Sequence, residues 1–335
     1  MMEQYVATKE KYNDCILFYR LGDFYEMFFD DAILASKELE LTLTGKDCGM
    51  EERAPMCGIP FHAADTYINQ LVKKGYKVAI GEQVEDPKLA KGLVKREVIR
   101  IVTPGTNLSA ESLEETKNNY LMCISHIGKY FGISVTDLST GVFKTCQIQT
   151  VEKVVDEINK FQPSEVLYHS GIEQIEDIHA VCERLQVAHT EAPDYYFDID
   201  TDEDTLKRHF HINSLEGLGL KDSLACIASC GGLIQYLHET QMNSLSHINH
   251  IETYSVDSYM ILDSSTRRNL ELTETLRDKQ KRGSLLWVLD KTKTAMGARK
   301  LREYVEQPLL DKTGIESRLD AVEALNEELV NREEL

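Results

Sequence analysis

The sequence predicts a multidomain α/β protein that ends in an all-α segment. Its 335 residues, 42% of them hydrophobic, are enough for two or three domains with real cores. Helical and strand-like patterns alternate at the start of the chain, consecutive strand-like runs follow, and the end is helical in composition. We expect a mixed α/β domain at residues 1–107, a linker at 108–118, a second domain at 119–250 and a truncated helical region at 251–335.

The first domain shows helical and strand-like segments in mixed order. Asp30 and Asp31 suit the start of a helix, because carboxylates are favourable at the positive end of the helix dipole. Gly75 suits the end of the next helix, and Pro104 with Gly105 closes the last strand. The expected helices are 5–12, 30–39 and 62–74, and the expected strands are 16–19, 41–44, 76–84 and 97–102.

The second domain opens with three apolar-rich runs, 120–127, 130–137 and 141–148, separated by Gly-Lys and Ser-Thr-Gly turns. Such runs predict consecutive antiparallel strands. A helix at 151–161 and a strand at 165–168 are expected to follow. Three antiparallel strands followed by alternating helix and strand is an RNase-H-like order.

The region after about residue 254 is helical in composition, with expected helices at 267–276, 285–289, 298–305 and 315–335. The last of these runs to Leu335 without a glycine, a proline or another stop signal. We therefore expect the chain to be a fragment of a longer protein.

Hydropathy and cysteine usage indicate a protein of the cytoplasm. No stretch approaches the roughly 18 apolar residues that a membrane helix needs, and we expect no signal peptide at the N-terminus. The eight cysteines include no Cys-x-x-Cys pair. Cys226 and Cys230 lie in an apolar, helical stretch, which favours buried thiols over a zinc site. Free thiols fit a reducing compartment.

The charge argues against a simple basic nucleic-acid binder, because the chain carries a net charge of −19. The excess of acidic over basic residues is concentrated in the middle of the chain. Residues 108–250 hold 9 Lys and Arg against 22 Asp and Glu, whereas residues 1–107 hold 14 against 17. The acidic run 198–204 is expected to be a solvated loop that repels DNA. Any DNA contact should therefore come from the first domain.

Residues 22–26, Gly-Asp-Phe-Tyr-Glu, form the most informative segment of the first domain. Gly22 ends an apolar strand and frees the backbone for a tight turn. If the next residues stay extended, Phe24 and Glu26 point to the same face. An aromatic ring beside a hydrogen-bonding acid suits a flat, stackable partner such as a nucleobase. Taken alone, the pattern also fits a ring packed in the core beside a turn.

The sequence around this segment closely resembles the MutS family of DNA mismatch-recognition proteins. The blocks that carry the resemblance spread in family order over nearly the whole chain: 15–32, 55–62, 79–84, 100–106, 263–272 and 283–301. The Phe-x-Glu signature of the family falls on Phe24 and Glu26. The resemblance implies that Phe24 stacks on a mispaired base and that Glu26 hydrogen-bonds this base. An inserted wedge of this kind kinks the duplex, and mismatched pairs resist it least.

The resemblance also implies the roles of the three regions and their partners. They correspond to the mismatch-recognition domain, the RNase-H-like connector domain and the start of an all-α core and lever domain. The implied ligand is double-stranded DNA with mismatches or small loops, bound near the nucleoid of a bacterial cytoplasm. For the whole protein, the resemblance implies a homodimer, ATP with Mg²⁺ as a switch, and a MutL-type partner. We expect no cofactor in this chain itself.

A cluster of basic residues late in the first domain is the expected source of DNA backbone contacts, because such groups neutralise phosphates without reading sequence. Glu97 is the one acid among them. The cluster comprises Lys88, Lys91, Lys95, Arg96 and Arg100. An ordinary solvated face is the alternative reading.

We expect no catalytic activity from this chain. Neither Lys46 nor Lys129 is followed by the Ser or Thr of a phosphate-binding Gly-x-x-x-x-Gly-Lys-Ser/Thr loop, so the ATPase of the family is not expected here. A nuclease would need acids converging on Mg²⁺, yet the first strand of the second domain carries none, and Asp137 suits the cap of a turn. His62 has no nucleophile pattern around it and is interpreted as structural. The alternative function is a protein-interaction module, in which the connector binds a MutL-type partner and DNA affinity is low.

Overall fold

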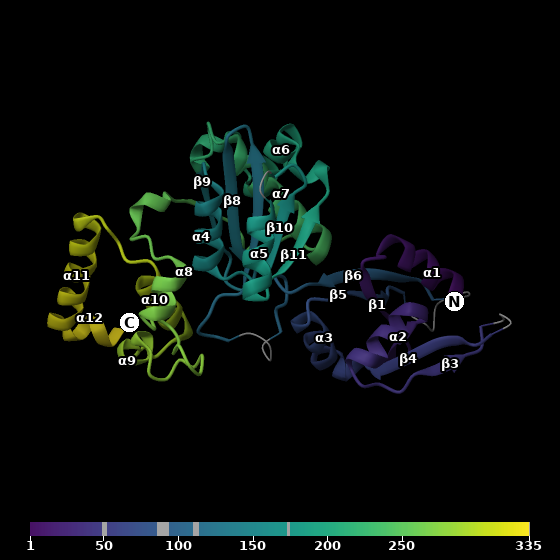
Figure 1. Cartoon of the computed structure of the whole chain (residues 1–335). Helices are drawn as coiled ribbons and strands as arrows, with labels where there is room; N and C mark the ends of the chain where they lie inside the picture. Colours follow the sequence, from purple (N-terminus) through teal and green to yellow (C-terminus); the bar gives the residue numbers. More distant parts are fainter. Residues whose placement is uncertain (49–51, 86–93, 110–113, 173–174, 335) are drawn as a thin grey trace.

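The computed structural model describes residues 1–48, 52–85, 94–109, 114–172 and 175–334. Figure 1 shows three parts in a row, which we call the N-terminal domain (residues 1–107), the central domain (residues 119–250) and the C-terminal segment (residues 251–335). The central domain lies between the other two. In the described part of the chain, no helix combines the length and the apolar character needed to cross a membrane.

The N-terminal domain is built on a mixed six-stranded sheet with the order β3-β4-β2-β1-β5-β6. Strands β1 and β5 are parallel, and all other neighbours are antiparallel. The strands are β1 (Cys15–Leu21), β2 (Phe24–Phe28), β3 (Thr44–Lys46), β4 (Ala54–Pro60), β5 (Lys77–Gln83) and β6 (Arg96–Val102). The helices are α1 (Met2–Lys11), α2 (Phe29–Glu38) and α3 (Ala64–Lys73), with a 3₁₀ turn η1 (Phe61–Ala63) before α3.

Helices cover both faces of this sheet. Helices α2 and α3 pack on one face, against a core that includes Phe18 and Met27. Helix α1 packs on the other face, where the ring of Tyr5 meets the rings of Tyr19 and Phe28 edge to face. Strand β1 therefore alternates between two cores, which fixes its register against its neighbours.

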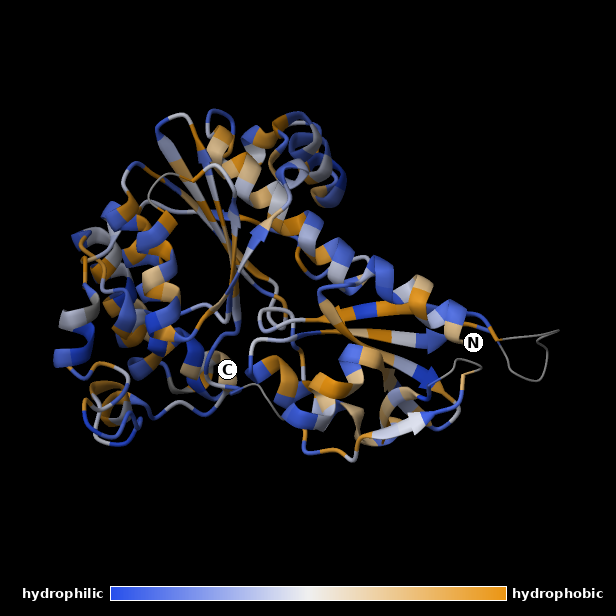
Figure 2. Cartoon of the chain, turned by 45° about the vertical axis from the view of Figure 1, so that its right-hand side comes forward, coloured by the Kyte–Doolittle hydropathy of each residue, from blue (hydrophilic) through white to orange (hydrophobic). Residues whose placement is uncertain are grey.

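The central domain has three layers, with helices on both faces of a second six-stranded sheet of order β11-β10-β7-β8-β9-β12. The strands are β7 (Tyr120–Ile127), β8 (Tyr130–Asp137), β9 (Val142–Ile148), β10 (Glu165–His169) and β11 (Ala188–Ala192). The sixth strand, β12 (Glu252–Thr253), comes from the start of the C-terminal segment and pairs with β9. The helices are α4 (Val151–Phe161), α5 (Ile175–Leu185), α6 (Ile199–Phe210) and α7 (Leu224–Gln241), with 3₁₀ turns η2 (Asp194–Phe197) and η3 (Leu215–Leu218). Figure 2 shows apolar residues running along the strands of this sheet.

Two cores hold the layers of the central domain together. Helices α4 and α5 contribute Val154 and Ile178 to one core, and α7 contributes Leu233 to the other. Helix α7 lies directly on β8 at Gly132, where an added Cβ would come within 2.0 Å of the carbonyl oxygen of Ala225. Only glycine permits this approach, so the site fixes where α7 crosses the sheet.

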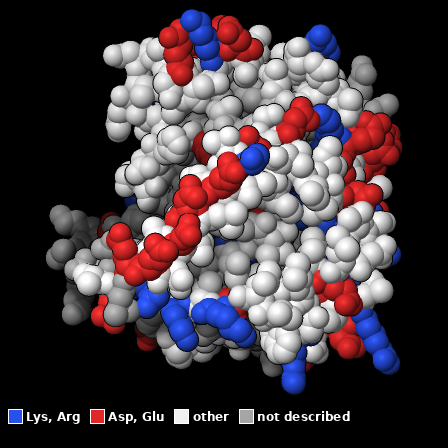
Figure 3. All heavy atoms as spheres, turned by 90° about the vertical axis from the view of Figure 1, so that its left-hand side faces the viewer, with Lys and Arg blue, Asp and Glu red and all other residues white. Residues whose placement is uncertain are grey.

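The C-terminal segment is helical and loosely packed. Its elements are η4 (Val256–Ser258), α8 (Ser264–Asn269), α9 (Leu285–Leu289), α10 (Ala295–Glu306), α11 (Lys312–Glu327) and α12 (Leu329–Glu334). Helix α11 has no buried residue, and Leu319 and Val322 are more than 60% exposed. Figure 3 faces this end of the molecule and shows acidic side chains in an oblique band. The ion pair of Lys144 in β9 with Glu303 in α10, at 2.7 Å, ties the segment to the central domain.

Three expected elements are wrong in their extent. The helix expected at 315–335 begins at Lys312 and is interrupted at Glu328, whose backbone is extended, before α12 starts at Leu329. The strand expected at 41–44 begins only at Thr44, and its partner β4 was not predicted. The backbone N–H of Leu41 instead donates to the carbonyl of Ser36 at the end of α2. The helix expected at 267–276 ends at Asn269, because Glu271 has a left-handed φ of 47°. Its carbonyl then accepts from the N–H of Leu285 at the start of α9.

The expectation of a solvated loop at 198–204 is wrong. Asp198 caps the N-terminus of α6, where its carboxylate accepts from the N–H of Thr201. Asp200 is exposed, whereas Asp202 is fully buried against α7. Acids at the start of a helix are favoured by its dipole, so the acidic run begins a helix instead of forming a loop.

Candidate nucleic-acid interface

The turn between β1 and β2 presents Phe24 to solvent. Gly22 has a left-handed φ of 60°, and nothing lies within 4 Å of the position that a Cβ would take, so backbone conformation and not space requires glycine. The carbonyl of Asp23 accepts from the N–H of Phe61 at 3.0 Å, which ties the turn to the end of β4. Phe24 opens β2 and is 49% exposed. The predicted alternative, a ring sealed in the core, is wrong.

Glu26 lies on the same face as Phe24, as the extended backbone predicts. In the antiparallel pair of β1 and β2, Leu21 stands opposite Phe24 and Tyr19 opposite Glu26, so these four side chains share one face of the sheet. The carboxylate of Glu26 accepts a charged hydrogen bond from Nζ of Lys46 in β3, at 2.5 Å. The side chain of Glu26 is 17% exposed and that of Lys46 is 33% exposed. Glu26 is therefore a paired, half-buried acid in the free protein.

A second exposed ring, Phe61, lies next to this turn and was not singled out from the sequence. Phe24 stands opposite Pro60 in β4, so Phe61 directly follows the residue that pairs with Phe24. The guanidinium of Arg20 lies 3.8 Å from the centroid of the Phe61 ring, a cation–π contact. The motif around residue 60 drew attention to His62 alone, which sits in η1 with its ring 5.9 Å from that of Phe61.

The same corner contains a half-buried, hydrogen-bonded acid, Glu82. Tyr25 donates its hydroxyl hydrogen to Glu82 of β5, and Nη1 of Arg20 lies 3.5 Å from the same carboxylate. Burial raises the pKa of Tyr25, and the hydrogen bond to Glu82 and its charge raise it further. The tyrosine therefore stays neutral and holds β2 to β5 across β1. This brace ties β2, which begins with Phe24, to β5.

The structure describes three of the five residues of the predicted basic cluster. Lys88 and Lys91 lie outside the described residues. Lys95 pairs with Glu97 at 2.5 Å, with both side chains more than half exposed. Arg100 lies in β6 opposite Ile80 and is half-buried. Contact of these residues with phosphates stays a prediction.

Arg96 has a role that the sequence did not reveal. Its Nε donates to the carbonyl of Arg20 at 2.7 Å, and its Nη1 donates to the carbonyl of Val94 at 2.8 Å. Its guanidinium also lies 5.5 Å from the centroid of the Tyr19 ring. Arg96 therefore links the start of β6 to the end of β1, next to the turn that carries Phe24.

Three other residues singled out in the sequence lie within the central domain. Asp137 is 1% exposed, and its carboxylate accepts from the N–H groups of Ser139 and Asn119, so it caps the turn after β8 as expected. Cys226 and Cys230 are both buried in α7. Burial raises the pKa of the Cys226 thiol to about 11 and that of Cys230 to about 12, so both stay protonated.

Comparison with known proteins identifies three regions in order. Family models match residues 1–111 as MutS domain I, residues 119–249 as MutS domain II and residues 265–335 as MutS domain III. The DNA mismatch repair protein MutS of Lachnoclostridium phytofermentans is 59% identical over 340 aligned residues, which cover 100% of this chain and 36% of that relative. Those of Acetivibrio thermocellus and Ruminiclostridium cellulolyticum are 52% and 51% identical, over 39% and 38% of their lengths. The chain thus spans less than two fifths of these relatives.

Proposed function

We propose that the chain, which belongs to the MutS family, binds double-stranded DNA at mispaired bases or small loops through the turn at Gly22. The observation that carries this proposal is the exposed ring of Phe24 on a braced turn, with Glu26 on the same face of the sheet. A loose surface aromatic would not hold one direction. Here the hydrogen bonds of Asp23, Tyr25 and Arg96 hold the turn in place.

In the proposed mechanism, Phe24 acts as a wedge from the minor-groove side. A mispaired step stacks poorly, so unstacking it and kinking the duplex there costs less than at a matched step. Base–aromatic stacking contributes about 1–3 kcal/mol and tolerates any base. Recognition then depends on how easily the site deforms, which suits the detection of an error in any sequence context.

Glu26 would serve in this mechanism as a conditional acceptor. Its pair with Lys46 keeps the carboxylate neutralised in the free protein. Near DNA, Lys46 has a competing partner in the phosphates, and a displaced base can offer Glu26 an N–H donor. Intact duplex offers no free donor, so there the carboxylate would face phosphates without compensation. The pair would therefore favour mismatched over matched DNA.

The rest of the proposal concerns the other regions and the whole protein. The antiparallel meander β7-β8-β9 followed by parallel β10 and β11 supports an RNase-H-like connector in the central domain. The C-terminal segment would begin the helical core and lever domain. For the whole protein we propose initiation of mismatch repair in the bacterial cytoplasm, as a homodimer that uses ATP and Mg²⁺ and recruits a MutL-type protein.

Fluorescence anisotropy with a G·T duplex and a matched duplex tests the wedge. Phe24→Ala is expected to lower the mismatch preference about tenfold or more, given the free energy of stacking. Tyr195→Ala is the matched control, because Tyr195 is 55% exposed but lies in the central domain. Unchanged preference in Phe24→Ala would refute the wedge. Absence of DNA binding in the wild type, together with binding to a MutL-type protein, would instead support an interaction module.

A further inference from the structure

The last residues of the N-terminal domain are buried against the central domain. We call residues 103–107 the junction segment. Thr103 and Thr106 are 0% and 1% exposed, and Asn107 is buried as well. The segment forms a turn in which the N–H of Thr106 donates to the carbonyl of Thr103, and the N–H of Thr103 donates to Oγ1 of Thr106. The end of the N-terminal domain is therefore ordered by its own hydrogen bonds before the chain leaves it.

One carboxylate of the central domain holds the junction segment. Glu165, the first residue of β10, is 1% exposed. Its Oε2 accepts from the hydroxyl of Thr103 and from the N–H of Gly105, the latter at 3.0 Å. Its Oε1 accepts from the hydroxyl of Tyr236 in α7, at 2.6 Å. Hydrogen bonds to a buried charge are strong, and their loss leaves the charge without compensation.

The junction segment also fits tightly against the central domain. A Cβ on Gly105 would lie 2.8 Å from Cδ1 of Leu121 and 3.0 Å from Cβ of Glu165. The side-chain amide of Asn119 donates to the carbonyl of Pro104 at 3.0 Å. Steric fit and hydrogen bonds therefore select one position of the segment on β7 and β10.

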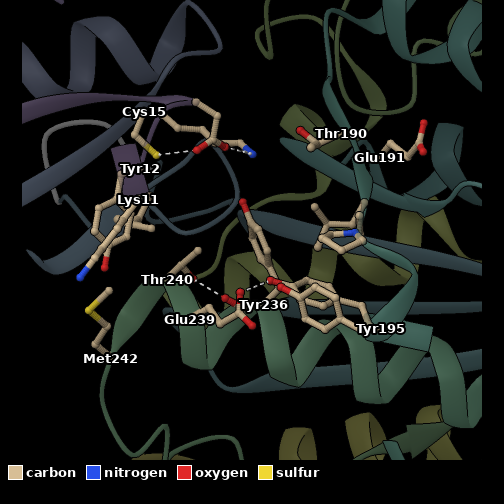
Figure 4. Close-up of a pocket in the computed structure, with 17 residues that line it drawn as sticks. Lys11, Tyr12, Cys15, Thr190, Glu191, Tyr195, Tyr236, Glu239, Thr240 and Met242 are labelled. Atoms are coloured by element: carbon tan, nitrogen blue, oxygen red, sulfur yellow. Dashed lines mark hydrogen bonds and ion pairs between the residues drawn. The ribbon is translucent and has the colours of Figure 1, made fainter. Parts of the chain in front are cut away.

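Apart from this contact and the hydrogen bond from the side-chain amide of Gln241 in α7 to the carbonyl of Ile101 in β6, open space lies between the two domains. A cavity of about 520 Å³ separates Tyr12 and Cys15 of the N-terminal domain from Tyr195 and Glu239 of the central domain. Figure 4 shows this space, which Tyr236 also lines. A second, wider groove of about 960 Å³ lies between the end of α3 and the ends of α4 and α5. Open space on both sides leaves room for the N-terminal domain to tilt about the junction segment.

A small tilt at the junction would displace the wedge. Cys15 at the start of β1 lines the cavity beside the junction, whereas Leu21 at its other end pairs with Phe24. Seven residues of β-strand span roughly 20 Å, so a tilt of about 10° would move the ring by about 3–4 Å. That displacement is comparable to the separation of stacked bases.

We propose that Glu165 is a positioning residue for DNA recognition, which locks the junction segment onto β10 and so fixes the direction in which Phe24 is presented. This inference rests on the proposed function. The lock has two kinds of donor. Thr103 and Gly105 bind the carboxylate across the domain boundary, whereas Tyr236 binds it from within the central domain. This difference separates positioning from simple stabilisation.

The test compares Thr103→Val with Tyr236→Phe, since each removes one hydroxyl donor to the same carboxylate. A donor dye on Cys48 and an acceptor dye on Glu183→Cys report the orientation of the two domains by single-molecule energy transfer without DNA. Cys48 is partly exposed and the other seven cysteines are buried, so the labels are selective. Thr103→Val is expected to broaden or shift the distribution, and Tyr236→Phe to leave it as in the wild type. Equal distributions in all three proteins, or equal broadening in both variants, would overturn the proposal.

DNA binding supplies the second readout. Thr103→Val is expected to lower the ratio of mismatched to matched affinity by about three- to tenfold, the range of one lost hydrogen bond. Glu165→Gln should restore most of the ratio that Glu165→Ala loses, because an amide oxygen can still accept from Thr103 and Gly105. Failure of this rescue would overturn the role of Glu165. A wild type without mismatch preference would refute the proposed function, while the energy-transfer comparison would still decide whether the lock exists.

Discussion

Replacement of Glu26 with glutamine should raise the affinity for matched DNA and lower the selectivity for mismatches. The substitution removes one negative charge and releases Lys46 from a pair of 2.5 Å. If the freed ammonium neutralises one phosphate, the slope of log affinity against log salt steepens by about 0.9. When the salt concentration is lowered roughly fourfold, the affinity of the variant should therefore rise about three- to fourfold more than that of the wild type.

The mismatched duplex should respond less, because a second effect opposes the first. A hydrogen bond to a charged acceptor contributes about 1 kcal/mol more than one to a neutral amide, so the base contact of residue 26 weakens about fivefold. The ratio of mismatched to matched affinity should therefore fall several-fold. Gain of affinity for matched DNA is the more direct sign, since simple loss of a contact cannot produce it.

Anisotropy titrations with matched and G·T duplexes at several salt concentrations measure both quantities. Glu97→Gln is the matched control, because Glu97 also holds a lysine, Lys95, at 2.5 Å in the same domain. Both substitutions change the net charge by the same amount. If the affinity for the matched duplex does not rise in Glu26→Gln, the reasoning is refuted. If it rises equally in Glu97→Gln, the effect comes from the change in net charge and not from the position of Glu26.

Two further predictions concern stability. Gly22→Ala should lower the free energy of unfolding in urea by about 1 kcal/mol and weaken the preference for mismatched DNA, because the φ of 60° at this position is unfavourable for alanine. Gly75→Ala is the control. This glycine has a φ of 88° and equally open space around it, so the substitution should lower stability by the same amount and leave the DNA preference intact. Burial, and then the charge of Asp198, raises the pKa of Asp202 from 3.8 to about 8. The folded protein therefore binds this proton more tightly than the unfolded chain does. The stability that the neutral carboxyl contributes is complete below about pH 4 and is lost as the pH rises towards 8, by up to about 1.4 kcal/mol per pH unit. Thermal melting of Asp202→Asn should show a weaker pH dependence in this window, and an unchanged dependence would contradict the assignment.

Features that depend on sequence neighbours were predicted well. The strands at 120–127 and 130–137 and the helix at 151–161 have the predicted bounds. Their apolar runs end at glycine turns, and Thr150 caps the helix through its hydroxyl. The turn at Gly22 belongs to the same class, because a left-handed glycine after an apolar strand is a local signal.

Features that depend on pairing between distant segments were not predicted. Glu26 meets Lys46 because β4 lies between β2 and β3, and β4 was not expected at all. Glu165 binds Thr103 across 62 positions of sequence. Asp202 lies in an acidic run whose composition is typical of a solvated loop, yet helical phase turns it towards α7. In each case tertiary packing decides what the side chain contacts, and composition carries no sign of it.

The pairing of charges in the N-terminal domain explains how an acidic chain can select mismatched DNA in the proposed mechanism. Non-specific affinity for DNA is electrostatic and depends on cations that are free to meet phosphates. Here Lys46, next to the proposed wedge, is engaged by Glu26, so this lysine attracts intact duplex little. Binding must then come from the stacking of Phe24 and from deformation of the site, both of which favour a weakened step. More unpaired lysines would strengthen binding to every duplex and reduce the difference between them. Selectivity in this arrangement follows from limiting the electrostatic attraction.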